Sequence, residues 1–344
     1  MPENKEVLKE FDRKVLHLLD GDSTLPYTKM ARSLHSSPQV MEYRVKSLLE
    51  RGVIKSFLAI IDYKKEGYTN YLVYFKFKGV LPEKEDGFVS FLRDLPLVNI
   101  ILRCDGGWDM AVGVLARDPF ELDDVLFRIH GEFGEYIDSQ SINAHVGAEH
   151  YCRDYLLPGK EHQGYEPEIP VTGAKAQLAD LDDTDRKVLY AVHEDARLPV
   201  TGVAERTGLS VDVVRYRLKT LKERKIIVGS TFLPDYSRYG FLLYRVLLKL
   251  KHQPKARTML FKYARDSPDV IRVISTSGEY QGTIDVEIES PAAMRELLLD
   301  LRNRFKDVLV SYDSLYVHSC ERFSYYRHGL GARRSASEKA RRRK

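Results

Sequence analysis

The sequence predicts an α+β protein built from tandem winged helix-turn-helix domains, each followed by a ferredoxin-like βαββαβ domain. The chain repeats itself, because residues 12–78 align without gaps on residues 185–251 with more than a third of the positions identical. A long match at one fixed shift indicates an internal duplication. In each copy, three segments with the apolar spacing of helices come first, and strand-like and helical segments then alternate.

Composition excludes several classes of protein. The 344 residues are 43% hydrophobic and 30% charged, and no apolar run reaches the roughly 18 residues that cross a membrane. The polar residues 1–12 lack the apolar core of a secretory signal. The three cysteines lie far apart, so they predict neither a disulfide framework nor a metal site. We therefore expect a cytoplasmic protein with no membrane contact, no metal and no cofactor.

The duplication and the breaks in periodicity divide the chain into segments. A stretch rich in Pro, Gly and charge separates the copies and predicts a linker, with a loop packed on the first half as the alternative. The tail concentrates positive charge, which predicts a disordered segment that contacts phosphates or only aids solubility. The predicted segments are helix-turn-helix domains at 8–63 and 181–236, sensor domains at 68–150 and 240–320, a linker at 157–180 and a basic tail at 330–344.

The start of each copy predicts three helices. In the first copy Val15, Leu16 and Leu19 have helical spacing, which stops at a Gly-Asp pair. Pro26 precedes a second, short helix, and Ser37 is placed to cap a third. Matching signals recur 173 residues later.

The connection between the second and third helices has the spacing of a helix-turn-helix. Two helices that cross over a short turn need a small residue at their contact, which Ala31 and Ala204 supply. The turn favours a positive φ, for which Gly208 is suited and His35 only tolerable. We expect both copies to form the motif, the first less ideally.

The third helix of each copy has an inner apolar face and an outer polar face. We expect Val40 and Met41 to point inward, with Val213 and Val214 as their counterparts. A helix presented in this way fits the major groove of DNA, where its side chains meet base edges and phosphates. A basic amphipathic helix alone is more often a solvated surface, and the complete three-helix pattern is what favours DNA. The predicted DNA-binding residues are Gln39, Glu42, Tyr43, Arg44, Lys46, Asp212, Arg215, Tyr216, Arg217 and Lys219.

Each three-helix segment continues into elements that suit a small sheet covered by helices. A β-rich stretch comes first, as expected of a wing or of a strand that leads to the next domain. In the TIDVEIE segment, Ile284 and Val286 alternate with Asp285 and Glu287, which predicts a half-buried strand. The order strand, helix, strand, strand, helix, strand then predicts a ferredoxin-like antiparallel sheet in each half.

These residues resemble the Lrp/AsnC family of prokaryotic regulators. The resemblance rests on DRKVLHLL from Asp12, on the helix-turn-helix pattern of residues 37–54, and on DYKKEGY ending at Tyr68. Each copy resembles one family member, and the two copies together cover nearly the whole chain. The resemblance implies a transcription regulator that binds double-stranded DNA, forms homo-oligomers through its sensor-domain sheets and responds to a small-molecule effector, such as an amino acid or another metabolite.

The resemblance also implies an effector site at one turn of each sensor domain. The family carries a glycine, an aromatic residue and an aspartate there; the first half has GGWD, and the second has GEYQ, without the aspartate. A plain hairpin turn is the simpler interpretation of a glycine before an aromatic residue. The predicted effector-binding residues are Gly107, Trp108, Asp109, Gly278 and Tyr280.

The duplication predicts that one chain forms an intramolecular pseudo-dimer. Glu42 and Arg215 occupy matched positions in the two predicted recognition helices. Because side chains of opposite charge prefer different base edges, we expect the target to be an asymmetric pair of half-sites.

Two other functions stay open. Siroheme decarboxylases also resemble Lrp/AsnC proteins and work as paired, related subunits, and a protein-interaction scaffold with vestigial helix-turn-helix units is the other alternative. We expect no enzyme and assign no catalytic residue, because no catalytic motif is recognisable and the histidines do not cluster by spacing. The candidates for a tetrapyrrole pocket are His130, His145, His150, His318, and Arg103 or Arg272.

Overall fold

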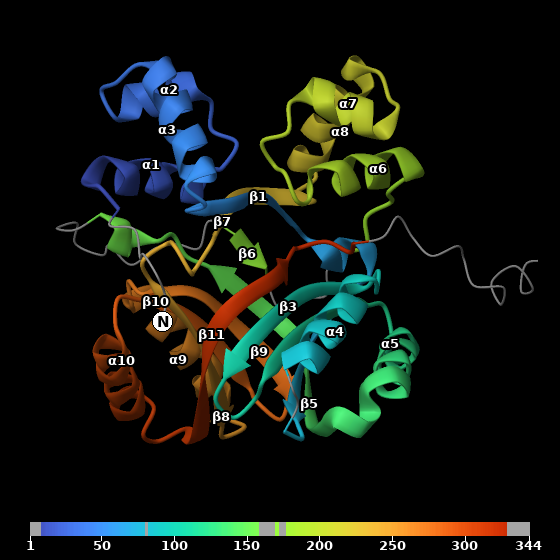
Figure 1. Ribbon diagram of the computed structural model, residues 1–344, viewed down its shortest axis with the longest axis vertical. Helices are drawn as coiled ribbons and strands as arrows, with labels where there is room; N and C mark the ends of the chain where they lie inside the picture. Colours follow the sequence, from blue (N-terminus) through green and yellow to red (C-terminus); the bar gives the residue numbers. More distant parts are fainter. Residues whose placement is uncertain (1–7, 80–81, 158–168, 172–176, 329–344) are drawn as a thin grey trace, which may run out of the picture.

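The protein has two tiers, seen in a computed structural model that describes residues 8–79, 82–157, 169–171 and 177–328 (Figure 1). One tier holds two three-helix domains, and the other is a β-rich body with helices on its outside. A two-stranded ribbon lies between the tiers. No helix in these ranges is long and apolar enough to cross a membrane.

The first three-helix domain consists of α1 (Glu10–Gly21), α2 (Tyr27–Ser33) and α3 (Pro38–Glu50). The Ser37 side chain caps α3 by accepting a hydrogen bond from the backbone N–H of Val40. His35 adopts the positive φ of 49° that the turn requires. The helices enclose a core that includes Val15, Leu16, Leu19, Met30, Met41, Val45 and Leu48.

The second three-helix domain repeats this arrangement with α6 (Asp183–Val192), α7 (Val200–Thr207) and α8 (Val211–Glu223). Asp182 and Asp185 form a reciprocal capping box at the start of α6. Gly208 ends α7 with φ of 69°, and Ser210 caps α8. Both predicted helix-turn-helix motifs are therefore present.

The ribbon joins the two halves directly. Its strands are β1 (Ile54–Ile61) and β7 (Ile227–Pro234), one from each half, paired antiparallel with Leu58 opposite Thr231. Leu58, Ile60 and Leu233 pack on the body beneath, whereas Ala59 and Ile61 join the core of the second three-helix domain. The predicted wing strand thus pairs with its counterpart in the other half.

Each sensor half has the predicted βαββαβ order. The first contains β2 (Thr69–Phe77), α4 (Pro82–Arg93), β3 (Val98–Asp105), β4 (Met110–Ala116), α5 (Pro119–Phe133) and β5 (Ile137–His150). The second contains β8 (Leu242–Leu250), α9 (Pro254–Asp266), β9 (Val270–Gly278), β10 (Gly282–Ile288), α10 (Pro291–Arg304) and β11 (Leu309–Phe323). Short 3₁₀ turns η1 (Tyr63–Glu66), η2 (Gly134–Tyr136) and η3 (Asp154–Leu156) lie between elements.

The two sensor sheets join edge to edge into one closed ring. The strand order is β5-β2-β4-β3 in the first half and β11-β8-β10-β9 in the second. Strand β3 pairs antiparallel with β11, and β9 pairs antiparallel with β5. Each edge strand of one half therefore pairs with an edge strand of the other half, which is the arrangement of a small antiparallel barrel.

Apolar side chains cover the outer surface of this ring and part of its interior. Helices α4 and α5 cover the outer surface of the first half, and α9 and α10 cover that of the second. The TIDVEIE strand is not half-buried as predicted. Ile284 and Val286 lie under the helices, but Asp285 and Glu287 point into the closed ring and are 2% and 0% exposed. Closure of the ring removes the solvent-facing side that an open antiparallel sheet would have.

The predicted linker is partly structured. Within residues 157–180, Ile169–Val171 forms the short strand β6, which pairs with residues 148–150 of β5. Strand β2 pairs with β5 only as far as Ala144, so that edge of β5 is left for β6. The predicted basic tail, residues 330–344, lies outside the described residues.

Candidate functional site

The outer faces of α3 and α8 present matched aromatic residues to solvent. Tyr43 is 67% exposed, and its counterpart Tyr216 is 65% exposed. Met41 and Val214 are buried as predicted, but Val40 and Val213 are 40% and 38% exposed. Each of these valines stands three residues before the tyrosine and shares its outer face, so the prediction that they point inward was wrong.

Charged residues on the same faces form only exposed ion pairs. Lys46 lies 2.9 Å from Glu42, and Arg215 lies 2.8 Å from Asp212. Lys219 is 3.8 Å from Glu223. Exposed pairs of this kind contribute about 0–1 kcal/mol, so these cations can exchange their carboxylate partners for phosphates at little expense. Gln39 is also exposed on α3.

Arg44 and Arg217, which are also predicted to bind DNA, each pair with a buried aspartate. Arg44 is 3.4 Å from the buried carboxylate of Asp12 on α1, and Arg217 is 3.1 Å from that of Asp185 on α6. Each arginine holds the first helix of its domain against the third. They are partly buried anchors of the motif, because an ionised aspartate in the core requires a cation beside it.

The predicted effector turns meet each other in the ring. The indole Nε1–H of Trp108 donates to the hydroxyl of Tyr280 at 2.9 Å, and that hydroxyl donates to Asp313 at 2.7 Å. Tyr74 packs on both rings. The aromatic residue of each turn therefore packs against, and hydrogen-bonds to, the aromatic residue of the other turn.

The remaining residues of these turns have structural partners. Asp109 pairs with Lys76 at 2.6 Å and accepts from the backbone N–H of Phe77 at 2.7 Å. A Cβ at Gly278 would lie 2.4 Å from the carbonyl oxygen of Ile142, and a Cβ at Gly107 would approach Asp313 to 3.3 Å. None of the five predicted effector residues lines the interior pocket described next. Effector binding at the turns stays a prediction.

A pocket lined by both apolar and charged side chains lies between the ribbon and the end of the ring. Ribbon residues Leu58 and Thr231 line one side, and ring residues Leu102, Arg245 and Arg272 line another. The cavity is about 50 Å³, well below the roughly 300–1,000 Å³ of a typical ligand pocket. A ligand larger than a few water molecules therefore requires the ribbon to move away from the ring.

Two arginines share one carboxylate in this pocket. Arg245, from β8, binds Asp285 through two hydrogen bonds of 2.7 and 2.8 Å, and Arg272, from β9, lies 3.5 Å from the same carboxylate. Burial raises the pKa of Asp285, but the two guanidinium groups outweigh burial and hold that pKa below its usual value. Among the described residues, Arg245 Nη1 and Arg272 Nε have no hydrogen-bond partner.

A second buried network ties the first three-helix domain to the ring. Arg153 donates from its backbone N–H to Asp20 at 2.7 Å, and its guanidinium also contacts that carboxylate. The same guanidinium binds Glu287 of β10 at 2.7 and 2.9 Å. Tyr236 and Tyr155 donate to Glu287 as well. One arginine thus links the end of α1 to the inside of the ring.

The candidates for a tetrapyrrole pocket separate in space. His150 and Arg272 line the interior pocket, and Tyr325 bonds the His150 ring at 2.7 Å. Burial, with Arg272 and Arg153 nearby, lowers the pKa of His150 well below its usual value. His145 is partly buried, and its Nδ1 lies 3.2 Å from the hydroxyl of Tyr63.

The other candidates do not reach the pocket. His130 and His318 are exposed, and Arg103 is held by Glu85, Asp86 and Glu321. The sequence did not single out Arg245, Asp285 or Arg153. A usable signal was present for the first, because Arg245 interrupts the apolar strand LLYRVLLKL and a charge in a buried strand requires a partner.

Comparisons with known proteins agree with this architecture. The winged helix-turn-helix DNA-binding family matches residues 8–55 and 181–228. An uncharacterised HTH-type transcriptional regulator of Pyrococcus abyssi is 33% identical over 119 residues, which is 35% of this chain and 74% of the relative. The regulator LrpA of Pyrococcus horikoshii is 29% identical over 120 residues, covering 35% of this chain and 84% of LrpA.

One solved structure resembles almost the whole chain. The siroheme decarboxylase NirDL superposes with a TM-score of 0.57 over 92% of this chain and 93% of NirDL, at 14% sequence identity. At that identity the likeness concerns the fold alone.

The fold and the two recognition helices define a class of protein: a duplicated winged helix-turn-helix DNA-binding protein whose ferredoxin-like domains close into one ring. The chain belongs to the Lrp/AsnC family of DNA-binding transcription regulators, as the sequence predicted.

Proposed function

We propose that this protein is a single-chain transcription regulator whose two recognition helices read two different half-sites, acting by binding and not by catalysis. The observation that carries the proposal is the double connection between the halves. The β1–β7 ribbon joins the two three-helix domains, which we call the reading domains. The closed ring joins the two sensor domains. One chain therefore holds both reading domains without a second subunit.

The two reading domains are not equivalent. At matched positions α3 carries Gln39 and Glu42, whereas α8 carries Asp212 and Arg215. Arginine favours guanine in the major groove, while glutamate favours the amino group of cytosine. We therefore expect an operator with two unlike half-sites, the stronger one under α8.

Selection from random duplex DNA, with the full chain as bait, tests this arrangement. Arg215→Ala should weaken binding to the selected site about 5- to 150-fold, equivalent to about 1–3 kcal/mol, and relax one half-site only. Lys306→Ala, which removes an exposed cation from the body, is the matched control and should bind as the wild type does.

A second variant tests the asymmetry itself. Glu42→Arg gives α3 the residue that α8 carries at the matched position, so the preference of the first half-site should move towards that of the second. A palindromic site selected by the wild type, or binding without sequence preference, contradicts the proposal.

The interior pocket is the place where an effector would act. Two arginines with unpartnered N–H groups favour a ligand that carries a carboxylate, which an amino acid does. Such a ligand would separate the ribbon from the ring, because the cavity of about 50 Å³ is too small as it stands. Since the ribbon carries both reading domains, this movement would change their spacing on DNA.

Thermal unfolding with each of the twenty protein amino acids in turn tests the effector site. A rise in melting temperature that Arg272→Met abolishes and Arg304→Met leaves intact supports the pocket; Arg304 is an exposed arginine on α10. A rise in melting temperature that persists in Arg272→Met would show that the amino acid binds outside the pocket. If no amino acid shifts the melting temperature, the amino-acid effector is contradicted and the DNA-binding proposal stands unchanged.

A tetrapyrrole enzyme is the second candidate, favoured by one observation. His150 and three arginines surround the pocket at the junction of the two halves, and tetrapyrrole substrates carry several carboxylates. Titration with siroheme, followed by its absorbance and by mass spectrometry of the product, separates the two functions. A bound spectrum with loss of carbon dioxide supports the enzyme, whereas an unchanged spectrum supports the regulator.

A further inference from the structure

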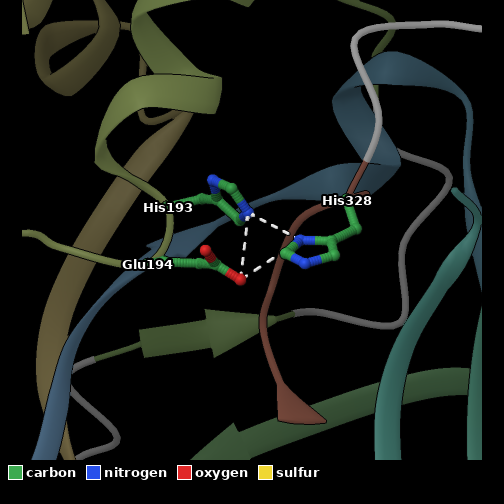
Figure 2. Close-up of side chains that lie close together, drawn as sticks. All are labelled: His193, Glu194 and His328. Atoms are coloured by element: carbon green, nitrogen blue, oxygen red, sulfur yellow. Dashed lines mark hydrogen bonds and ion pairs between the residues drawn. The ribbon is translucent and has the colours of Figure 1, made fainter. Parts of the chain in front are cut away.

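Two histidines and a glutamate from distant parts of the sequence meet beside the second three-helix domain. His193 and Glu194 directly follow α6, and His328 lies in the segment after β11, 135 residues from His193. Figure 2 shows the three side chains converging on one point. Among the residues that the structure describes, these three are the only group of at least three His, Cys, Asp or Glu side chains whose donor atoms, one from each residue, all lie within 4.8 Å of one another.

The spacing of the three donor atoms matches one face of a tetrahedral metal site. His193 Nε2 is 3.4 Å from His328 Nδ1 and 3.8 Å from Glu194 Oε1, and His328 Nδ1 is 3.1 Å from that oxygen. Ligands at about 2.05 Å from Zn²⁺ in tetrahedral geometry lie about 3.3 Å apart. A single ion at the centre can therefore contact all three with small side-chain adjustments.

The His193 ring is already oriented as a metal ligand. Its Nδ1 lies 2.6 Å from the backbone carbonyl oxygen of Tyr190, so Nδ1 carries the proton and donates it there. Nε2 is then the unprotonated nitrogen, and it faces the cluster. A histidine held by a backbone carbonyl at its other nitrogen is the usual arrangement around bound metals. The ring is also fixed by stacking on Tyr190 and by an edge contact with Tyr326.

Histidine binds metal in its neutral form. Burial lowers the pKa of His193 and that of His328. One cation, Arg322, is close enough to lower both values further, but its guanidinium is engaged by the backbone carbonyls of Val98 and Arg93. Glu194 is half exposed, so water has access to the remaining coordination position.

The first half has a different contact at the corresponding place. The duplication aligns His193 with Asp20, and Asp20 binds Arg153 in the segment that follows β5. The segment after the last sensor strand thus meets the end of the first helix in both halves. In the first half an ion pair makes this connection, and in the second half the three candidate ligands occupy it.

We propose that His193, Glu194 and His328 bind one Zn²⁺ ion, which ties the end of the sensor ring to the second reading domain. Two imidazoles and one carboxylate favour Zn²⁺ over Mg²⁺ and Ca²⁺, which prefer oxygen ligands alone. This site is independent of the DNA sequence that the protein reads and of the interior pocket.

Calorimetric titration of the tag-free, chelator-treated full chain with ZnCl₂ tests the site. We expect one ion per chain and a melting temperature that rises with Zn²⁺ concentration. Because loss of an outer-shell partner alone weakens metal binding about 10- to 100-fold, His328→Ala should weaken it by about 100-fold or more. Glu194→Gln should weaken it too, and neither variant removes a fully buried side chain.

His318→Ala is the matched control, since His318 is exposed on β11 and lies outside the cluster. Titration with Co²⁺ gives a second readout, the intense visible absorbance of a tetrahedral ion, which His193→Gln should abolish. Hydrogen exchange of residues 320–328 should slow on Zn²⁺ addition in the wild type only. No binding by the wild type, equal binding by His328→Ala, or loss of binding in His318→Ala overturns the proposal.

Discussion

Replacing Arg153 by methionine tests whether the buried network holds the first reading domain on the ring. The substitution leaves two carboxylates without their cation, those of Asp20 and Glu287, whose side chains are 4% and 0% exposed. Removing one partner from a buried ion pair costs about 3–5 kcal/mol, and here both acids lose the same partner. We therefore expect the free energy of unfolding to fall by at least about 3 kcal/mol.

Urea unfolding measures this loss with two signals. Circular dichroism follows the helices, and the fluorescence of Trp108, the single tryptophan, follows the interior of the ring. Arg304→Met is the control, because its partner Asp300 is exposed and such pairs contribute only about 0–1 kcal/mol.

A triple change isolates the electrostatic part of the effect. Adding Asp20→Asn and Glu287→Gln to Arg153→Met removes the uncompensated charges, so part of the lost stability should return. If Arg153→Met loses less than about 1 kcal/mol, or no more than Arg304→Met, the network does not contribute as its burial implies.

Three further predictions follow from individual residues. Burial, with the nearby Arg245, lowers the pKa of His145 to about 3, so the folded protein keeps this imidazole neutral. Below about pH 6.5, the ordinary pKa of histidine, the unfolded chain takes up a proton that the folded chain does not. The free energy of unfolding therefore decreases as the pH is lowered, by up to about 1.4 kcal/mol per pH unit. In His145→Gln the curve of unfolding free energy should be shallower between about pH 6 and 4, and parallel curves would contradict this assignment. Gly278→Ala should destabilise the ring by about 1–3 kcal/mol in urea unfolding, because φ is 153° and the new Cβ would meet the Ile142 carbonyl at 2.4 Å; an unchanged midpoint would refute it. Tyr216→Ala should weaken DNA binding in fluorescence anisotropy without lowering the melting temperature, since the ring is 65% exposed; the reverse pattern would make it a structural residue.

Local signals predicted the reading domains well. Ser37 and Gly208 are capping and turn residues whose roles depend on their immediate neighbours, and the structure places both as expected. The ion pairs of Arg44 and Arg217 were not predicted, because they depend on buried aspartates of another helix, Asp12 on α1 and Asp185 on α6.

The sites could not be predicted from the sequence because they depend on ring closure. An alternating strand such as TIDVEIE predicts one apolar and one polar face, but it does not indicate that the polar face is enclosed. Asp285 meets arginines from β8 and β9, and His193 meets a residue 135 positions away. Pairings between strands of different halves have no local sequence signal.

The closed ring has a consequence for how this regulator responds to its own abundance. A regulator assembled from two subunits must first dimerise, so at low expression its active fraction falls with concentration. In this chain both sensor edges are already paired internally, and the partner half is present at the fixed effective concentration of a covalent tether. At low occupancy, the occupied fraction of operators should therefore rise in proportion to the number of chains, and the halves of this chain should not exchange with those of related regulators in the same cell.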